Sequence, residues 1–191
     1  MLALLMVLLS APTTMQPHRA KPQPSPNAAP VTPAKMSPEE VQARIQMYLG
    51  TIDRPVTPGM WQRLGPAAIP SLEKIARDPE QLPTKRAGAL GGISAIGSLT
   101  APDLMLDLAK DEKQPMAVRI AAIAGAGHVA PDDRVAQELR PVMENAANGH
   151  VRRIAAEVLA AHGGCAAVRA QAKREQYDRL SKALKTCNET K

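Results

Sequence analysis

Apolar residues recur at the helical period from about residue 37 onward. Ser37, Pro38 and Glu40 form a capping-box pattern, in which a serine and a glutamate three residues later satisfy backbone N–H groups at the start of a helix. Apolar side chains then mark one helical face as far as Gly50. The pattern predicts a first helix over 37–50, and Thr57-Pro58 begins a shorter second one that ends by residue 65.

A repeat of 33 residues runs through the middle of the chain. An arginine follows an acidic residue by eight positions three times, in the pairs Asp78 and Arg86, Asp111 and Arg119, and Glu144 and Arg152. The apolar positions shift with the same period. Repeats of this length are helical units that cannot bury their own apolar faces and must stack on their neighbours. The sequence therefore predicts an all-α fold of stacked layers.

Three segments, 64–72, 85–91 and 118–122, resemble HEAT repeats of the short phycobilisome-lyase-like type. The resemblance covers residues 64–164 well and continues loosely to 191. It implies an α-α superhelix, or solenoid, of about four to five helical pairs within residues 37–191. First helices are expected near 66–77, 101–110 and 131–147, and second helices near 84–97, 116–127 and 149–162. On this template Thr100 and Asp103 cap one helix start, and Pro70 and Pro141 fall inside helices.

The same resemblance assigns roles to particular residues. In HEAT-like repeats the recurring acid and arginine link adjacent layers, which makes a structural ladder of Asp78, Arg86, Asp111, Arg119 and Arg152. Glu144 has a longer side chain than the two aspartates, so its place in the ladder stays open. The second helices of such solenoids line a concave surface. The residues expected to contact a partner on that surface are Lys85, Gln114, Arg119 and Arg153.

Composition limits how the core is filled. The chain of 191 residues has no Phe, one Trp and two Tyr, so its interior must be built from Ala, Leu, Ile, Val and Met. Small side chains allow helices to approach closely. The glycines between 88 and 97 fit the same interpretation, because no Gly-Lys-Ser/Thr of a phosphate-binding loop accompanies them.

Two segments precede the predicted helical region. Residues 1–17 begin with an apolar run of signal-peptide length, and residues 18–36 are a proline-rich linker that we expect to be disordered. No basic residue precedes the apolar run and no clean cleavage site follows it, so cleavage after Thr13 or Ala20 stays open. A disordered apolar leader on a cytosolic protein is the alternative. Membrane attachment is expected only through an uncleaved leader.

The net charge of +6 is concentrated at the C-terminus, where residues 151–191 hold nine basic and four acidic side chains. A solvated basic face is the simplest interpretation, and an anionic lipid, a glycan or an acidic protein is a candidate contact. Nucleic-acid binders usually add stacking aromatic residues to such charge. C-terminal to Trp61 the only aromatic residue is Tyr177. This scarcity argues against nucleic acid as the partner.

Catalytic and metal-binding patterns are missing from the sequence. The segment 92–96 lacks the second glycine of a nucleophile elbow and falls in a predicted helix. His128 and His162 end successive second helices and are expected one layer apart, but neither ligand number nor spacing matches a metal site. No cofactor or metal is expected.

Cys165 and Cys187 are the two cysteines. One straight helix over 166–187 would hold them about 33 Å apart, too far for a disulfide. The 33-residue period instead predicts a fourth helical pair with a turn near 174–178, which would bring the two cysteines together. An exported chain would then form a Cys165–Cys187 disulfide.

Together these patterns favour an exported, non-catalytic HEAT-repeat scaffold or adaptor of the bacterial periplasm or cell envelope that binds an unidentified protein. An enzyme, or an enzyme accessory related to HEAT-like lyases or hydroxylases, is the alternative. A basic nucleic-acid-binding protein is the second alternative.

Overall fold

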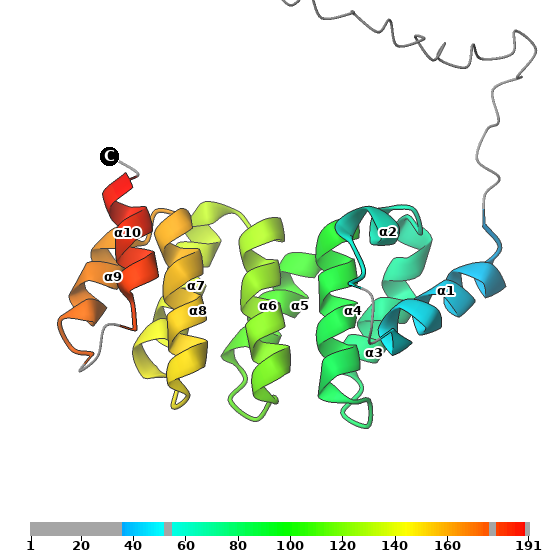
Figure 1. The fold of residues 1–191 in the computed structure, drawn as a ribbon, viewed down its shortest axis with the longest axis horizontal. Helices are drawn as coiled ribbons and strands as arrows, with labels where there is room; N and C mark the ends of the chain where they lie inside the picture. Colours follow the sequence, from blue (N-terminus) through cyan, green and yellow to red (C-terminus); the bar gives the residue numbers. More distant parts are fainter. Residues whose placement is uncertain (1–35, 52–54, 176–178, 190–191) are drawn as a thin grey trace, which may run out of the picture. The chain divides into compact units, whose positions relative to one another are not determined.

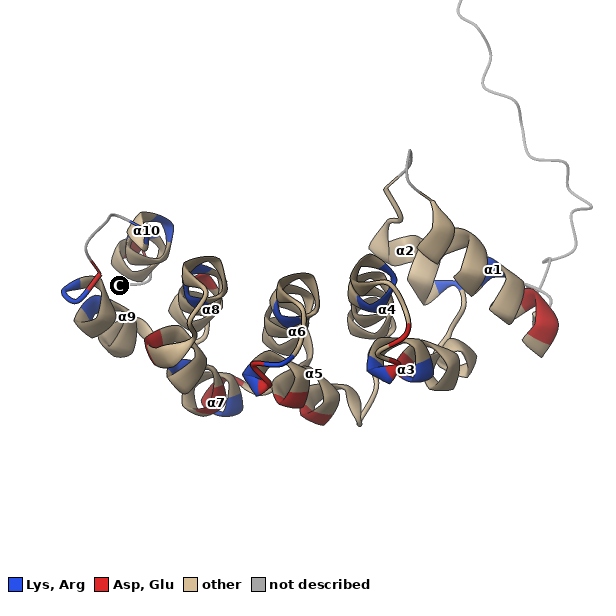
Figure 2. Ribbon diagram, turned by 90° about the horizontal axis from the view of Figure 1, so that it is seen from below, with Lys and Arg blue, Asp and Glu red and all other residues tan. Residues whose placement is uncertain are grey.

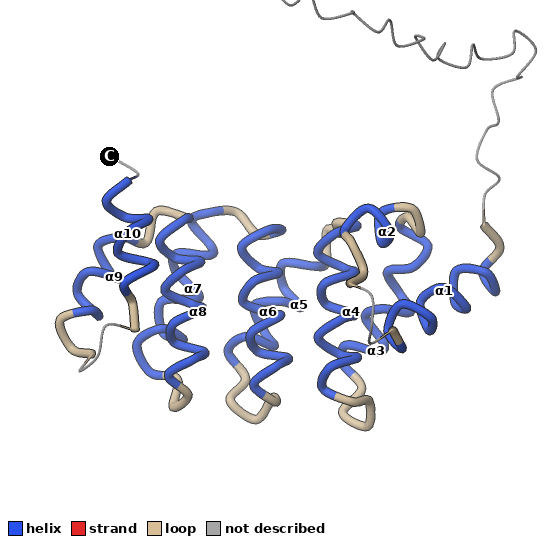
Figure 3. The backbone as a smooth tube through the Cα atoms, viewed as in Figure 1, coloured by secondary structure: helices blue, strands red, loops and turns tan. Residues whose placement is uncertain are grey.

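The computed structural model describes residues 36–51, 55–175 and 179–189 (Figure 1). Residues Met36–Lys191 form one compact unit, separate from residues Met1–Lys35. The predicted leader, and the linker except for Met36, lie outside the described residues. Every regular element in the described part of the chain is a helix (Figure 3), which confirms the all-α fold class. None of these helices is long and apolar enough to cross a membrane.

The described region begins with the predicted capping box. Helix α1 (Pro38–Gly50) starts at Ser37, whose Oγ accepts from the Glu40 backbone N–H while the Glu40 carboxylate accepts from the Ser37 N–H. The short helix α2 (Pro58–Gln62) and the 3₁₀ turn η1 (Pro66–Ala68) follow. The Tyr48 and Trp61 rings pack edge to face, with centroids 5.1 Å apart, and join α1 to α2.

The remaining helices form consecutive pairs. They are α3 (Ile69–Arg77) with α4 (Pro83–Ile96), α5 (Ala101–Lys110) with α6 (Met116–Val129), α7 (Asp132–Asn145) with α8 (Gly149–Ala161), and α9 (Cys165–Ala172) with α10 (Ser181–Glu189). The second helices also contact one another, from α4 to α6, from α6 to α8 and from α8 to α10. Figure 2 shows α4, α6 and α8 in one row, with α3, α5 and α7 in a second row below it.

The repeat period appears directly in the helix bounds, because α4, α6 and α8 begin at residues 83, 116 and 149. Helix α5 spans the predicted 101–110. Two local predictions were wrong. Pro70 lies in the first turn of α3 rather than inside the helix, where its missing N–H removes no helical hydrogen bond. Thr100 does not cap α5 with its side chain, because its hydroxyl donates to Glu73 Oε1 at 2.7 Å. Pro141 does lie inside α7.

Small residues bring the helices close together. Gly92 of α4 lies under the indole of Trp61, so a Cβ added there would be 2.9 Å from the Trp61 Cε3 atom. Gly125 of α6 faces Met105 of α5 in the same way, at 2.7 Å from the Sδ atom. The largest fully buried side chains are aliphatic, among them Leu72, Leu90 and Ile123. A core without Phe is thus filled by aliphatic side chains at short interhelical distances.

The Cys165–Cys187 disulfide is present, and its two Cα atoms are 5.4 Å apart. Cys165 begins α9 and Cys187 lies near the end of α10, so the last two helices form the predicted hairpin. The predicted turn at 174–178 lies between them, although residues 176–178 are outside the described part. Arg169 of α9 adds a second link by donating to the Cys187 carbonyl oxygen at 2.8 Å.

Gly91 and Gly92 form a matched pair for testing this packing. Gly92→Ala should destabilise the fold by about 1–3 kcal/mol, because the new methyl group meets a rigid indole. Gly91→Ala should stabilise it by roughly 0.5–1 kcal/mol, because no atom lies within 4 Å of its added Cβ and alanine favours the helix. Urea unfolding monitored by circular dichroism measures both changes. Equal effects at the two positions would contradict the proposed Trp61 contact.

Candidate functional site

Among the predicted ladder residues the structure links Arg86 to Asp111, and it does so through Gln114 rather than directly. The buried Arg86 donates from Nε to the Ala76 carbonyl oxygen at 2.9 Å and from Nη2 to Oε1 of Gln114 at 2.6 Å. Gln114 in turn donates from Nε2 to Oδ2 of Asp111 at 2.6 Å. One layer is therefore linked to the next through a glutamine that stands between the arginine and the acid.

The aspartates have a second, local function. Asp111 also accepts from the Lys113 backbone N–H at 3.0 Å. This bond and the stronger one from Gln114 lower the pKa of Asp111 below its ordinary value. Asp78 makes the equivalent hydrogen bonds one repeat earlier, accepting from the Glu80 backbone N–H and from Gln81 Nε2. Each aspartate thus orders the loop between the two helices of its pair.

Arg119 was predicted to bond to Asp111 or to an acid of a neighbouring layer. It instead donates from Nε to the Ala109 carbonyl oxygen at 3.1 Å, the equivalent of the bond from Arg86 to Ala76. Its side chain is buried, with the whole residue 5% exposed. Its assignment to the exposed partner-binding surface was therefore wrong, because a guanidinium held at the end of α5 cannot reach a partner.

The third repeat departs from the first two. Arg152 donates from Nη1 to the Ala146 carbonyl oxygen at 2.8 Å and forms an ion pair with Glu175, with Nε 2.8 Å from Oε1. Glu144 pairs with Arg140 of its own helix at 2.8 Å. It occupies the acid position in the repeat but makes none of the loop bonds that Asp78 and Asp111 make within the described residues.

The other predicted contact residues are partly exposed and differ in how they are engaged. Lys85 lies near the start of α4. Gln114 is committed to the link between Arg86 and Asp111. Arg153 of α8 forms an ion pair with Glu157 and contacts the His150 ring. None of these three residues lines either of the two clefts described next.

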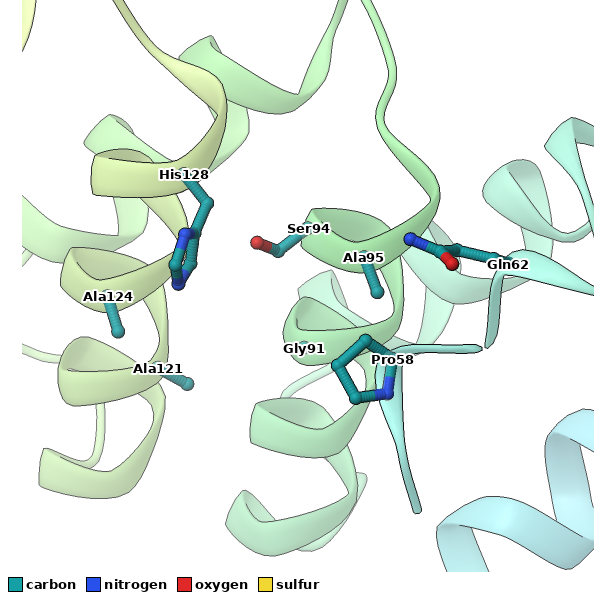
Figure 4. A pocket seen from close by; sticks show the side chains of 9 residues that line it. Pro58, Gln62, Gly91, Ser94, Ala95, Ala121, Ala124 and His128 are labelled. Atoms are coloured by element: carbon teal, nitrogen blue, oxygen red, sulfur yellow. The ribbon is translucent and has the colours of Figure 1, made fainter. Parts of the chain in front are cut away.

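A cleft of about 590 Å³ lies between α4 and α6, with α2 as its third wall. Figure 4 shows its lining, which consists of Pro58, Gln62, Gly91, Ser94, Ala95, Ala121, Ala124, Gly125 and His128. None of these residues is an aspartate, glutamate, lysine or arginine. Most of the wall is hydrocarbon from glycine, alanine and proline, a composition typical of binding clefts with few polar groups.

Three side chains supply the polar groups of this cleft. Ser94 of α4 and His128 of α6 face each other across it, and Gln62 of α2 lies near the same end (Figure 4). Among the described residues, none of these three side chains has a protein hydrogen-bond partner. The side chains of Arg86, Arg119 and Gln114, in contrast, all form hydrogen bonds. The donors and acceptors of Ser94, His128 and Gln62 remain available to a bound molecule.

A second cleft of about 380 Å³ lies between α6 and α8, with α10 as its third wall. It shares Ala124 and His128 with the first cleft, so the two are adjacent across α6. Its charges are internally paired. Glu157 binds both Arg153 and Lys182, the latter at 2.7 Å, and His162 Nδ1 lies 2.7 Å from Asp132 Oδ1.

The predicted proximity of the two histidines is found, because His128 and His162 both line the second cleft. Within the described residues, however, no group of three or more His, Cys, Asp or Glu side chains is placed to hold a metal ion. The arrangement of Ser94 opposite His128 joins a hydroxyl to a potential base, yet no carboxylate of the first cleft's lining is available to orient the imidazole.

Sequence reasoning did not identify Gln62, Ser94 or Ala124 as binding residues. One signal was available. Helix α6 carries a single arginine, and that arginine is buried, so its outward positions lack charge. A surface helix of a globular protein usually places charged residues on its outer face. The departure at Ala121, Ala124 and His128 marks the face that the clefts occupy.

The basic C-terminal residues are partly neutralised in the structure. Lys182 pairs with Glu157, Lys185 with Glu189 and Arg152 with Glu175. Lys173 and Arg174, at the end of α9, are exposed. Fewer unpaired positive charges are therefore present on the predicted basic face than the number of basic residues in 151–191 suggests.

Comparison with protein-family models, with curated proteins and with solved structures finds no match to this chain. The clefts and their residues are therefore interpreted from geometry and chemistry alone.

Gln114→Ala should destabilise the protein by about 1–3 kcal/mol, because it removes the partner of a buried Arg86 donor and of an Asp111 oxygen. Gln81→Ala is the matched control. Gln81 occupies the same position one repeat earlier and, in the described part, bonds only Asp78, so its loss should cost less than about 1 kcal/mol. Chemical denaturation compares the two variants. A larger effect at Gln81 would show that the link between layers contributes nothing.

Acid should weaken the Arg152–Glu175 link. Arg152 lowers the pKa of Glu175 below its ordinary value of 4.5, so the folded state holds this proton less tightly than the unfolded state does. The stabilisation is then fully present above about pH 5 and is lost as the pH falls through the lower, folded pKa. Glu175→Gln should flatten the pH dependence of the melting temperature below pH 5. A profile identical to that of the unmodified protein would contradict this prediction.

Proposed function

We propose that this chain is an exported, non-catalytic scaffold or adaptor that binds a protein partner on the face formed by α4, α6 and α8. The observation that carries the proposal is the pair of adjacent clefts on that face. The first has no charged side chain in its lining, and the charges of the second are paired with one another. A cleft lined mainly by hydrocarbon with a few polar groups is a common binding site for another molecule.

The arrangement of helices supports a solenoid of HEAT-like pairs. Three second helices begin at intervals of 33 residues and contact one another in sequence. Arginines at equivalent positions bond equivalent carbonyl groups in the first two full pairs. Repeated units that contact only their neighbours are the defining property of solenoids, which commonly bind other proteins along one face.

Export is supported by the Cys165–Cys187 disulfide, because disulfides persist mainly in oxidising compartments. The apolar leader predicted at residues 1–17 is consistent with that route. We therefore propose the periplasm or cell envelope of a bacterium as the location. An anionic surface contact through Lys173 and Arg174 is compatible with binding a protein at the clefts.

The enzyme alternative has one observation in its favour, the placement of Ser94 opposite His128. Without an orienting carboxylate in the lining, this pair lacks the third component that makes a serine a strong nucleophile. The nucleic-acid alternative has less support, since no lysine or arginine lines the larger cleft. Protein binding accounts for the uncharged lining better than either alternative.

Affinity purification of the tagged full chain from its native cells tests the proposal. Ala124 is exposed and lines both clefts, so Ala124→Arg places a charge where they adjoin with little effect on folding. Ala170→Arg, at an exposed position of α9, is the matched control. We expect the specific partner to be recovered at least tenfold less with Ala124→Arg and equally with Ala170→Arg. Equal recovery with all three proteins would refute the assignment of this face.

A further inference from the structure

The clefts on α4, α6 and α8 have features that narrow the kind of partner that fits. Helix α6 is apolar on nearly all sides. Its inner face packs on α5, and its outer face leaves Ala124 and His128 exposed and Ile120 and Ala121 half-buried. A helix that is apolar all round is normally covered on every side. The outer face of α6 therefore marks where the partner makes its closest approach.

The neighbouring helices limit the width of what can reach α6. Helix α2 contacts α4 and supplies Pro58 and Gln62 to the first cleft, and α10 contacts α8 and supplies Lys182 and Thr186 to the second. Figure 2 shows α2 and α10 raised on the same side of the row formed by α4, α6 and α8. A broad, flat surface, or the same face of a second copy, would meet these raised helices first. A single rod such as an α-helix, roughly 10–12 Å across with its side chains, avoids this clash more readily than either of them.

Backbone hydrogen bonding distinguishes a helix from an extended peptide. An extended chain presents an unpaired N–H and C=O at each residue, and each one buried without a partner costs free energy. Most of the cleft is lined by Pro58, Gly91, Ala95, Ala121 and Ala124, whose side chains offer no hydrogen-bonding group. A helix satisfies its own backbone groups except at its ends, so it can lie on such a floor without this cost.

The three available polar groups suit the end of a helix. Gln62, Ser94 and His128 gather towards one end of the cleft (Figure 4). The terminal turn of a helix leaves four backbone groups without intrahelical partners, and a carboxamide, a hydroxyl and an imidazole can donate or accept as required. The positions of these side chains therefore match the place where a docked helix needs external partners.

The charge of the lining defines the helix face. A lysine or glutamate pressed against Gly91, Ala121 and Ala124 would lose water and gain no opposite charge, because none lines the first cleft. Small residues on the floor also permit a close approach that larger side chains would prevent. The fitting face is thus uncharged and apolar.

From these observations we propose that the partner inserts one amphipathic α-helix between α2 and α10. This inference rests on the proposed function and specifies its ligand. The uncharged face of the inserted helix lies along Gly91, Ala121 and Ala124, and one end of it bonds Gln62, Ser94 and His128. Its length matches α4 and α6, which have 14 residues each. The mode is that of a helix in a groove, with anchors at every third or fourth residue.

The test is a selection from two displayed libraries of 14-residue peptides, with the full-length, disulfide-intact protein as bait. One library has a helix-forming background and varies the residues at i, i+3, i+4, i+7 and i+11 among apolar and charged types. The other is fully random, so that it contains proline-rich and acidic peptides. Enriched peptides are synthesised, and their dissociation constants are measured by fluorescence anisotropy. The proteins compared are the unmodified chain, Ala124→Arg, Ser94→Ala and Ala170→Arg.

We expect binders from the helical library whose varied face is free of charge and which gain helicity on binding. Their dissociation constants should rise at least tenfold with Ala124→Arg, about two- to tenfold with Ser94→Ala, and less than twofold with the Ala170→Arg control. A proline in the middle of the peptide should abolish binding.

Three results would overturn the inference: no binders, binders that are extended or charged on the contact face, or binders that tolerate Ala124→Arg. The affinity purification separates this failure from that of the proposed function. If a cellular partner still depends on Ala124, the docking face stands and the helical partner is wrong. If the cellular partner also tolerates Ala124→Arg, both proposals fall.

Discussion

The bond from a buried arginine to the last turn of the preceding helix is the contact on which the stacked pairs depend. Arg86 reaches the carbonyl of Ala76, and Arg119 reaches that of Ala109. A helix end carries unsatisfied carbonyl groups and a partial negative charge, and a buried guanidinium requires acceptors, so each supplies what the other lacks. The bond fixes how the second helix of a pair lies against the first. That placement determines which faces of the pair can contact the neighbouring pairs. It also determines which face points outward and carries the clefts.

Such contacts leave little freedom between layers. Arg86 continues through Gln114 to Asp111, so the loop of one pair is tied to the arginine of the pair before it. The next step of the series is interrupted, because residue 147, which corresponds to Gln114, is alanine. The third pair uses the Arg152–Glu175 ion pair to reach the segment after α9. The first two full pairs are therefore joined through a glutamine that bonds a guanidinium and a carboxylate, and the third pair is joined to the segment after α9 by an ion pair.

The sequence predicted the helices well because the 33-residue period and the helix-start residues act locally. The bounds of α5 and the capping box at Ser37 depend on neighbours within a few residues. The bonds of the ladder were harder to predict. A spacing of eight shows that an acid and an arginine recur, but not that the guanidinium turns to a carbonyl. The role of Gln114 was missed, although Asp78 and Gln81 recur as Asp111 and Gln114. The first cleft was hardest to predict from the sequence, because it combines residues of α2, α4 and α6 that only the folded chain brings together.

The position of the disulfide bears on the second cleft as well as on the end of the chain. Lys182 and Thr186, which form one wall of that cleft, lie on the same helix as Cys187. The cross-link to Cys165 therefore restrains the position of α10, which forms this wall. The first cleft is built differently, because its α2 wall contacts α4 through the packing of Trp61 on Gly92. The α10 wall of the second cleft is therefore held by a covalent link, and the α2 wall of the first cleft by contact between an indole and a glycine.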